Sequence, residues 1–117
     1  MNAEELQKRT KDFAKRIIHL CRKLPSTREG KLIGNQIFRS GTSIGANYRA
    51  ACRGRSKGDF IAKLGIVLEE ADETLYWLEL IEETHIIKSD LLQPLIKENN
   101  EIISICVSSL KSMRKMK

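Results

Sequence analysis

Apolar residues recur at alternating steps of four and three positions in four successive segments of this chain. Residues spaced in this way lie above one another on one side of an α-helix, so the spacing is that of an amphipathic helix. Aromatic residues make up 5% of the chain, and Leu, Ile, Lys, Glu and Arg dominate it, which is typical of long helices rather than sheets. The chain therefore has the pattern of an all-α protein.

Each segment has its own predicted apolar face. The first consists of Leu6, Thr10, Phe13, Ile17, Leu20 and Leu24. The second consists of Ile33, Ile37, Ser40, Ile44, Asn47 and Ala51. The third consists of Phe60, Leu64, Val67, Ala71, Thr74, Leu78 and Ile81. The fourth consists of Leu92, Ile96, Asn99, Ile103, Cys106, Leu110 and Met113.

Helix-breaking and helix-capping residues separate these segments. Pro25 ends the first helix, and a side chain in Ser26-Thr27 caps the second. Gly54 is the predicted end of the second helix, Ser56 the cap of the third, and Ser89 the beginning of the fourth. Because the connections are short, we predict a single domain over residues 1–117, an antiparallel up-down-up-down four-helix bundle.

The net charge of +6 is distributed unevenly along the chain. Residues 1–58 contain 14 Lys and Arg against 4 Asp and Glu, whereas residues 59–117 contain 7 basic and 11 acidic residues. Such asymmetry is typical of a protein with an anionic partner, and also of self-association between opposite faces of two subunits.

Ten cations are candidates for contacts with phosphate groups. Two adjacent rows on the first helix turn away from its apolar face, and a basic turn follows the second helix. The candidates are Lys8, Arg9, Lys15, Arg16, Arg22, Lys23, Arg49, Arg53, Arg55 and Lys57. Such a face binds nucleic acid without sequence specificity. Two other interpretations remain: a solvated surface, or pairing with the acidic outer face of the third helix in a neighbouring subunit.

A tract of small residues in the second helix contains Gly41 and Gly45. Glycine inside a helix costs about 1 kcal/mol relative to alanine, so close approach of another helix or a second subunit is expected to offset it. Asn47 falls on the predicted apolar face of the same helix, where a single amide typically fixes register or subunit number. We assign Gly41, Gly45 and Asn47 to an interface or register role.

Residues with catalytic or metal-binding potential do not form a recognisable set. Cys21, Cys52 and Cys106 are odd in number and far apart, which favours reduced thiols in a cytoplasmic protein. One Glu82-x-x-His85 motif occurs, but a di-iron bundle needs two, so we expect neither metal nor cofactor. The sequence contains no Walker loop and no Ser/His/Asp set, and we expect neither a signal peptide nor a membrane span. We predict that the protein is not an enzyme.

At Ser43-Ile-Gly-Ala-Asn47 and Arg55-Ser-Lys-Gly-Asp-Phe60 the chain resembles the bacterial 23S rRNA intervening-sequence proteins. The resemblance implies a small cytoplasmic bundle, often a ring-like homopentamer. A related bundle is the accessory protein of diversity-generating retroelements, which is similar to a basic ring that binds nucleic acid and a reverse transcriptase. The chain departs from the family pattern at Gly45, often proline there, and at Ala50-Ala51, often Glu-Gly. Arg49 and Arg53 make its basic turn more cationic than is usual.

The leading hypothesis is a non-catalytic bundle that binds structured RNA or DNA through phosphate contacts as a ring-like homo-oligomer. The alternative is a structural or assembly module whose charged faces mediate self-association or bind an acidic protein. Under both hypotheses the protein is a homo-oligomer, but only the first requires a nucleic-acid partner.

Overall fold

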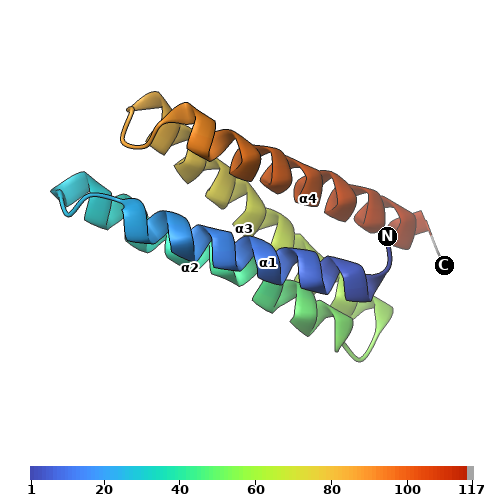
Figure 1. The fold of residues 1–117 in the computed structure, drawn as a ribbon. Coiled ribbons are helices and arrows are strands. Elements are labelled where there is room, and N and C mark those ends of the chain that lie inside the picture. The colour runs from blue at the N-terminus through green and yellow to red at the C-terminus, as the bar shows by residue number, and fades with distance from the viewer. Residues whose placement is uncertain (116–117) are drawn as a thin grey trace.

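The computed structural model describes residues 1–115, which fold into four antiparallel helices (Figure 1). The helices are α1 (Ala3–Lys23), α2 (Arg28–Cys52), α3 (Lys57–Glu83) and α4 (Ser89–Lys115). They form an elongated bundle of 50 × 21 × 19 Å. The predicted all-α, up-down-up-down four-helix bundle is confirmed.

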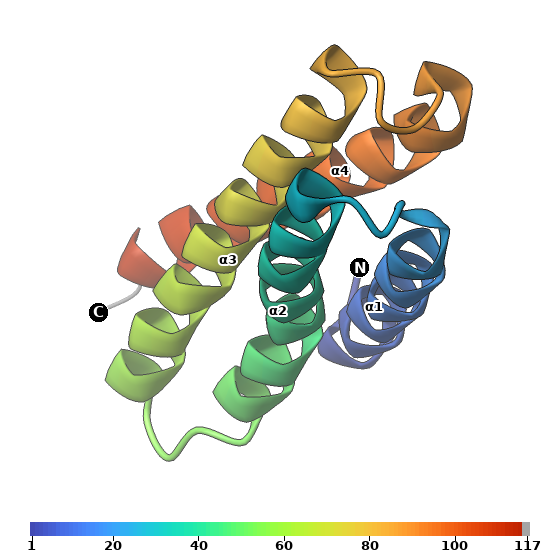
Figure 2. The ribbon, with the colours of Figure 1, turned by 90° about the vertical axis from the view of Figure 1, so that its left-hand side faces the viewer.

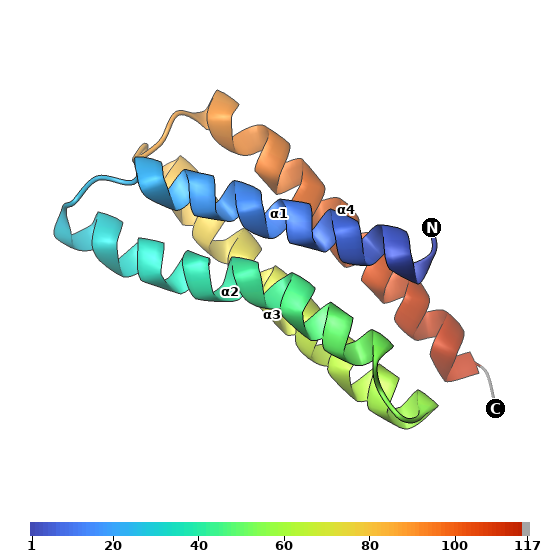
Figure 3. The same cartoon turned by 60° about the horizontal axis from the view of Figure 1, so that its bottom comes forward.

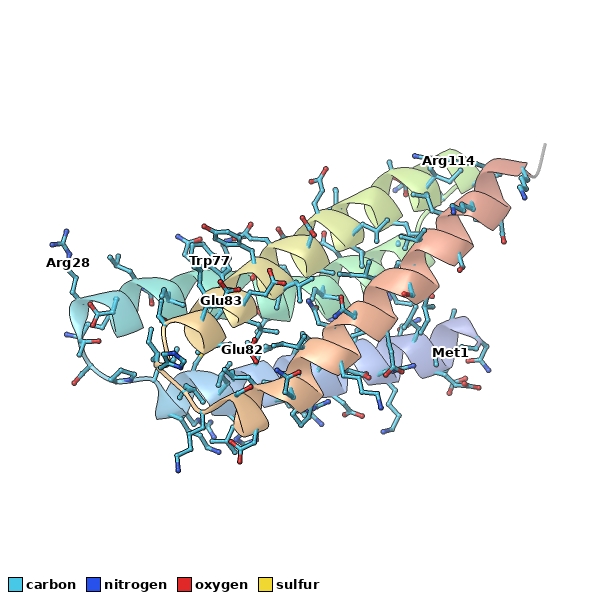
Figure 4. The ribbon with its side chains drawn as sticks, turned by 90° about the horizontal axis from the view of Figure 1, so that it is seen from above. Met1, Arg28, Trp77, Glu82, Glu83 and Arg114 are labelled. Atoms are coloured by element: carbon cyan, nitrogen blue, oxygen red, sulfur yellow. The ribbon has the colours of Figure 1, made fainter. Side chains whose placement is uncertain are left out.

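Helices that follow one another in the chain pack side by side, whereas α1 and α4 meet over a much shorter stretch (Figures 2 and 3). The residues of α1 and α3 do not come into close contact, because these two helices are diagonal to one another. Met1 and Arg114 lie at one end of the bundle, and Arg28 and Glu83 at the other (Figure 4). The outer surfaces of α1 and α3 therefore face in opposite directions.

The apolar faces of α1 and α3 are buried as the spacing predicts. In α1 the buried residues are Leu6, Thr10, Phe13, Ile17 and Leu20. In α3 they are Leu64, Val67, Ala71, Thr74, Leu78 and Ile81. Phe60 at the start of α3 is half-buried and packs against this core.

In α2 the predicted face is wrong at one position. Tyr48 is buried with 5% of its surface exposed, whereas Asn47 is half-buried. The Asn47 amide donates to the Ser43 carbonyl of its own helix at 2.8 Å. Asn47, three residues after Ile44, and Tyr48, four residues after it, both lie near the core. Burying the tyrosine ring removes more apolar surface from water than burying the amide would. Asn47 is therefore not a core residue.

Each helix contributes one buried polar side chain: Thr10, Ser40, Thr74 and Asn99. The Thr74 hydroxyl donates to Ser40 Oγ at 2.9 Å, which joins α3 to α2. Asn99 Nδ2 donates to the Ala71 carbonyl at 3.0 Å, and its Oδ1 accepts no hydrogen bond from residues 1–115. Asn99, not Asn47, is the buried amide of the bundle.

Side-chain caps define the starts of the helices. Thr27 accepts from the Gly30 amide at 3.2 Å, and Ser56 accepts from the Asp59 amide at 3.1 Å, so the predicted cap of α3 is confirmed. At the end of α3, His85 has a φ of 59°, and its amide donates to the Glu82 carbonyl. His85 therefore terminates α3 in the left-handed conformation.

Gly41 and Gly45 let α2 approach α1. A Cβ atom on Gly41 would lie 2.8 Å from side-chain carbons of Ile17, and one on Gly45 would lie 3.2 Å from the Thr10 carbonyl. Both neighbours belong to α1, and Ile17 is fully buried. The glycines thus serve the packing of α1 against α2 within one subunit.

We predict opposite effects from two glycine-to-alanine substitutions. Gly41→Ala should lower the free energy of unfolding by about 1–2 kcal/mol, because the methyl group overlaps Ile17 in a filled core. Gly65→Ala should raise it by up to about 1 kcal/mol, because nothing lies within 4 Å of a Cβ there and alanine favours the helix. Urea unfolding of the two variants and the wild type measures both changes. Equal stability of the two variants would contradict the close α1–α2 packing.

Candidate nucleic-acid interface

The first predicted row of α1 is Lys8, Lys15 and Arg22, and all three side chains are exposed on the surface opposite the core. Asp12 lies between the first two of them. Its carboxylate is 3.0 Å from Lys8 Nζ and 3.7 Å from Lys15 Nζ. Lys8 holds the pKa of Asp12 below its ordinary value, chiefly by a hydrogen bond. This row is therefore a partly compensated cationic surface.

The second row, Arg9, Arg16 and Lys23, lies on the side of α1 that faces α4. Arg9 Nε and Nη2 donate to the two carboxylate oxygens of Glu98 at 2.7 and 2.8 Å. Arg9 Nη2 also donates to Glu101 at 2.7 Å. The two carboxylates raise the pKa of Arg9, whose charge is thus paired within the subunit. Arg9 joins α1 to α4 and is not free to contact a phosphate.

Arg16 and Lys23 remain exposed beyond Arg9. Together with His19 they line a hollow of about 170 Å³ between the end of α1 and the beginning of α4. Its other walls are apolar and include Ile87 and Leu91. Arg16 also contributes, after Arg9, to lowering the pKa of Glu98.

The basic turn joins α2 to α3 at the end of the bundle where α1 begins (Figures 1 and 3). Arg49, Arg53 and Arg55 are exposed, and Lys57 is half-buried as the first residue of α3. The backbone amide of Arg55 donates to Asp59 at 3.3 Å, which fixes the path of the turn. The structure thus separates the ten candidates, with Arg22 and Lys23 at one end of the bundle and the basic turn at the other.

A groove runs between α1 and α2 and has a volume of about 390 Å³. We call it the α1–α2 groove. It is lined by Gln7, Lys8, Lys11, Ala14, Thr42, Gly45, Ala46 and Arg49. Lys11 was not among the candidates predicted from the sequence, because it belongs to neither of the two rows of α1, whose members are seven residues apart. Its position three residues after Lys8 and four before Lys15 places it next to both on the helix surface.

The outer side of α3 is acidic and partly apolar. Glu70 and Glu73 are engaged by Arg39 of α2, with Arg39 Nη1 at 2.9 Å from Glu70. Arg39 lowers the pKa of Glu73, and the Trp77 indole N–H, which donates to the same carboxylate at 3.1 Å, adds to the effect. Glu69, Asp72 and Glu83 are exposed.

Apolar side chains are exposed on α3 beside these carboxylates. Ile66 and Tyr76 have exposed fractions of 43% and 55%. The Tyr76 ring packs edge-on against Trp77, with 5.1 Å between the ring centres. The outer surface of α3 therefore exposes both carboxylates and two large apolar side chains.

The remaining reactive groups are not assembled into a site. Burial raises the pKa of the Cys106 thiol to about 11 and also raises that of Cys21. Among residues 1–115 no three His, Cys, Asp or Glu side chains are grouped so as to hold a metal ion. Within the same residues, no helix has the length and apolar character needed to cross a membrane.

The fold and its surface define a class, a small four-helix bundle with an acidic outer surface on α3 and a cationic face on the other side. We call the exposed Lys and Arg side chains of α1, α2 and the turn that follows α2 the cationic α1–α2 face. The chain belongs to the 23S rRNA-intervening sequence protein family, whose model matches residues 3–108. The resemblance drawn from the sequence is confirmed.

A crystal structure from Bacteroides thetaiotaomicron VPI-5482 has a similar fold, with a TM-score of 0.86. That protein is described as one of unknown function from the S23 ribosomal protein family. It is 40% identical, and the match covers 91% of this chain and 98% of that one. No curated protein matches the chain.

We predict that Arg9→Met destabilises the bundle by about 1–3 kcal/mol at neutral pH, because Glu98 is left half-buried without its partner. Arg9 holds the pKa of Glu98 below its ordinary value, so this stabilisation is present above the unfolded-state pKa and is lost as the pH falls. The difference in the free energy of unfolding between wild type and variant should therefore shrink below about pH 4. Urea unfolding at neutral and acidic pH measures it.

Lys8→Met is the matched control, because it removes a cation of the same helix whose ion pair is exposed. It should change stability little at any pH. A loss of stability in Arg9→Met that stays constant down to acidic pH would contradict the stabilising role of the Arg9–Glu98 ion pair.

Proposed function

We propose that the protein is a non-catalytic, homo-oligomeric nucleic-acid-binding bundle whose cationic α1–α2 face contacts phosphate groups. One observation supports this most directly. Several exposed cations of α1 and α2 make no ion pair within residues 1–115, whereas Arg9 and Arg39 each bind two carboxylates. The unpaired exposed cations of α1, α2 and the turn that follows α2 are Lys11, Arg16, Arg22, Lys23, Arg28, Lys31, Arg49, Arg53 and Arg55.

Unpaired exposed cations are suited to replacing the counterions of a phosphate backbone. Each phosphate contact releases condensed counterions, so affinity falls steeply as salt is added. Within residues 1–115 no recognition helix or aromatic stacking surface accompanies the cations, so binding through the backbone is expected to be indifferent to base sequence. The family's description refers to 23S rRNA, which makes structured RNA the first probe.

We predict that Lys15→Glu combined with Arg16→Glu weakens binding of RNA hairpins of different sequence to the same extent. Losing two phosphate contacts should also reduce the slope of log affinity against log salt by about 2. Polarisation of fluorescein-labelled hairpins, titrated at several salt concentrations, measures both. Lys97→Glu with Lys111→Glu is the matched control, since it makes the same charge change at exposed positions of α4. Equal losses in both double variants would mean that net charge alone controls binding.

A second candidate function, an assembly module, is favoured by the acidic and apolar surface of α3. Ile66 and Tyr76 are exposed among carboxylates, on a surface that faces away from the cations of α1. A copy of the chain can therefore place its α3 surface against the α1 surface of the next copy, and repetition of this head-to-tail contact builds an oligomer.

Light scattering tests this second function. The assembly function predicts that Lys15→Glu with Arg16→Glu dissociates the oligomer and that added RNA leaves the mass unchanged. Nucleic-acid binding predicts that the double variant keeps the wild-type mass and loses RNA. A monomeric wild type would remove the assembly function and the oligomeric part of the proposal.

A further inference from the structure

We infer that the α1–α2 groove is the primary phosphate-binding site and receives the sugar–phosphate backbone of a nucleic-acid strand. This inference rests on the proposed function and assigns it to a defined place. It also adds Lys11, which the row pattern did not single out, to the binding residues. Cations outside the groove, such as Lys15 and Arg16, then contact the phosphates that flank the bound stretch of the strand.

Cations reach the groove from both of its walls. Lys8 and Lys11 come from the first half of α1, and Arg49 comes from the last turn of α2. A phosphate group in the groove is therefore approached by two ammonium groups and one guanidinium, and the guanidinium can donate two parallel hydrogen bonds to phosphate oxygens. Convergence from two helices distinguishes this place from a row of lysines along one helix.

No carboxylate lines the groove, so its formal charge is +3. Lys11 and Arg49 make no ion pair within the described residues, and Lys8 is paired only with the exposed Asp12. The hollow on α4 is different, because it sets Lys97 beside Glu101. The hollow between α1 and α4 is smaller, and apolar residues form most of its lining. Among these hollows, the α1–α2 groove has the highest positive charge.

Small residues line the groove between its cations. Gly45 has no side chain, and a Cβ there would already lie 3.2 Å from the Thr10 carbonyl of α1. Ala14 and Ala46 add only methyl groups, and Ala46 is exposed. A strand can therefore come close to both helices without displacing a large side chain. The absence of aromatic side chains from the lining favours the phosphate backbone over a stacked base as the occupant.

The groove continues towards the basic turn. Arg53 follows Arg49 by four residues and lies one turn further along the same side of the chain, and Arg55 comes two residues later. A strand that leaves the groove at Arg49 thus meets two further unpaired arginines at the same end of the bundle. Successive phosphates can be held along this path, which a site for a single free anion would not require.

The test fills the groove without changing its charge. Ala46→Leu places a larger side chain on the groove surface, and Ala62→Leu makes the same change at an exposed position of α3. We expect Ala46→Leu to weaken binding of a fluorescein-labelled RNA hairpin by about tenfold, and Ala62→Leu to leave it within about twofold. Circular dichroism confirms that both variants are folded.

Removal of one positive charge from the groove provides a second test, which does not depend on filling the groove. Lys11→Gln should weaken hairpin binding by about fivefold and reduce the salt slope by about 1, whereas Lys97→Gln on α4 should do neither. If Ala46→Leu and Lys11→Gln bind like the wild type while Lys15→Glu with Arg16→Glu binds poorly, the groove assignment is wrong and the proposed function stands. If the wild type binds no hairpin at low salt, both are wrong.

Discussion

The close approach of α1 and α2 determines much of the rest of this structure. A Cβ on Gly41 would overlap Ile17 and one on Gly45 would be tight against the Thr10 carbonyl, so the two helices pack at short range. Each glycine costs about 1 kcal/mol of helix stability, which the packing of the fully buried Ile17 offsets. The same approach brings Lys8 and Lys11 of α1 opposite Arg49 of α2. Core packing and the candidate binding groove therefore depend on the same pair of glycines.

Two arginines divide the charges of the bundle into those used for folding and those left for a partner. Arg9 binds Glu98 and Glu101 where α1 and α4 meet over a short stretch, and Arg39 binds Glu70 and Glu73 between α2 and α3. Both engage acidic residues of the second half of the chain. The remaining cations of α1 and α2 are left facing solvent, opposite the acidic outer surface of α3. This separation of charge is compatible with a phosphate backbone and with a second copy of the chain.

Local spacing was sufficient to predict the four helices, the buried residues of α1 and α3 and the Ser56 cap, because these depend on neighbours within two turns. It was insufficient in α2, where Asn47 and Tyr48 both lie near the core and tertiary packing selects the larger apolar side chain. It was also insufficient in α4, where Leu95 and Ile102 are buried and the predicted Ile96 and Ile103 are only half-buried. Arg9 was predicted to be a surface cation. Its ion pair could not be foreseen from local spacing, because its partner Glu98 is 89 positions away in the chain. Lys11 was missed because the groove exists only when α1 and α2 are packed together. The family resemblance supplied the fold independently, but not the placement of these residues.

Phosphate groups are proposed to bind the α1–α2 face. Nuclear magnetic resonance of isotopically labelled protein, titrated with an RNA hairpin at moderate salt, tests this residue by residue. We expect the largest chemical-shift changes at Lys11, Gly45, Ala46 and Arg49, extending into the turn at Arg53 and Arg55, while the signals of Ile66 and Tyr76 on α3 stay unchanged. Shifts confined to α3 and α4, or no shifts at all, would contradict it.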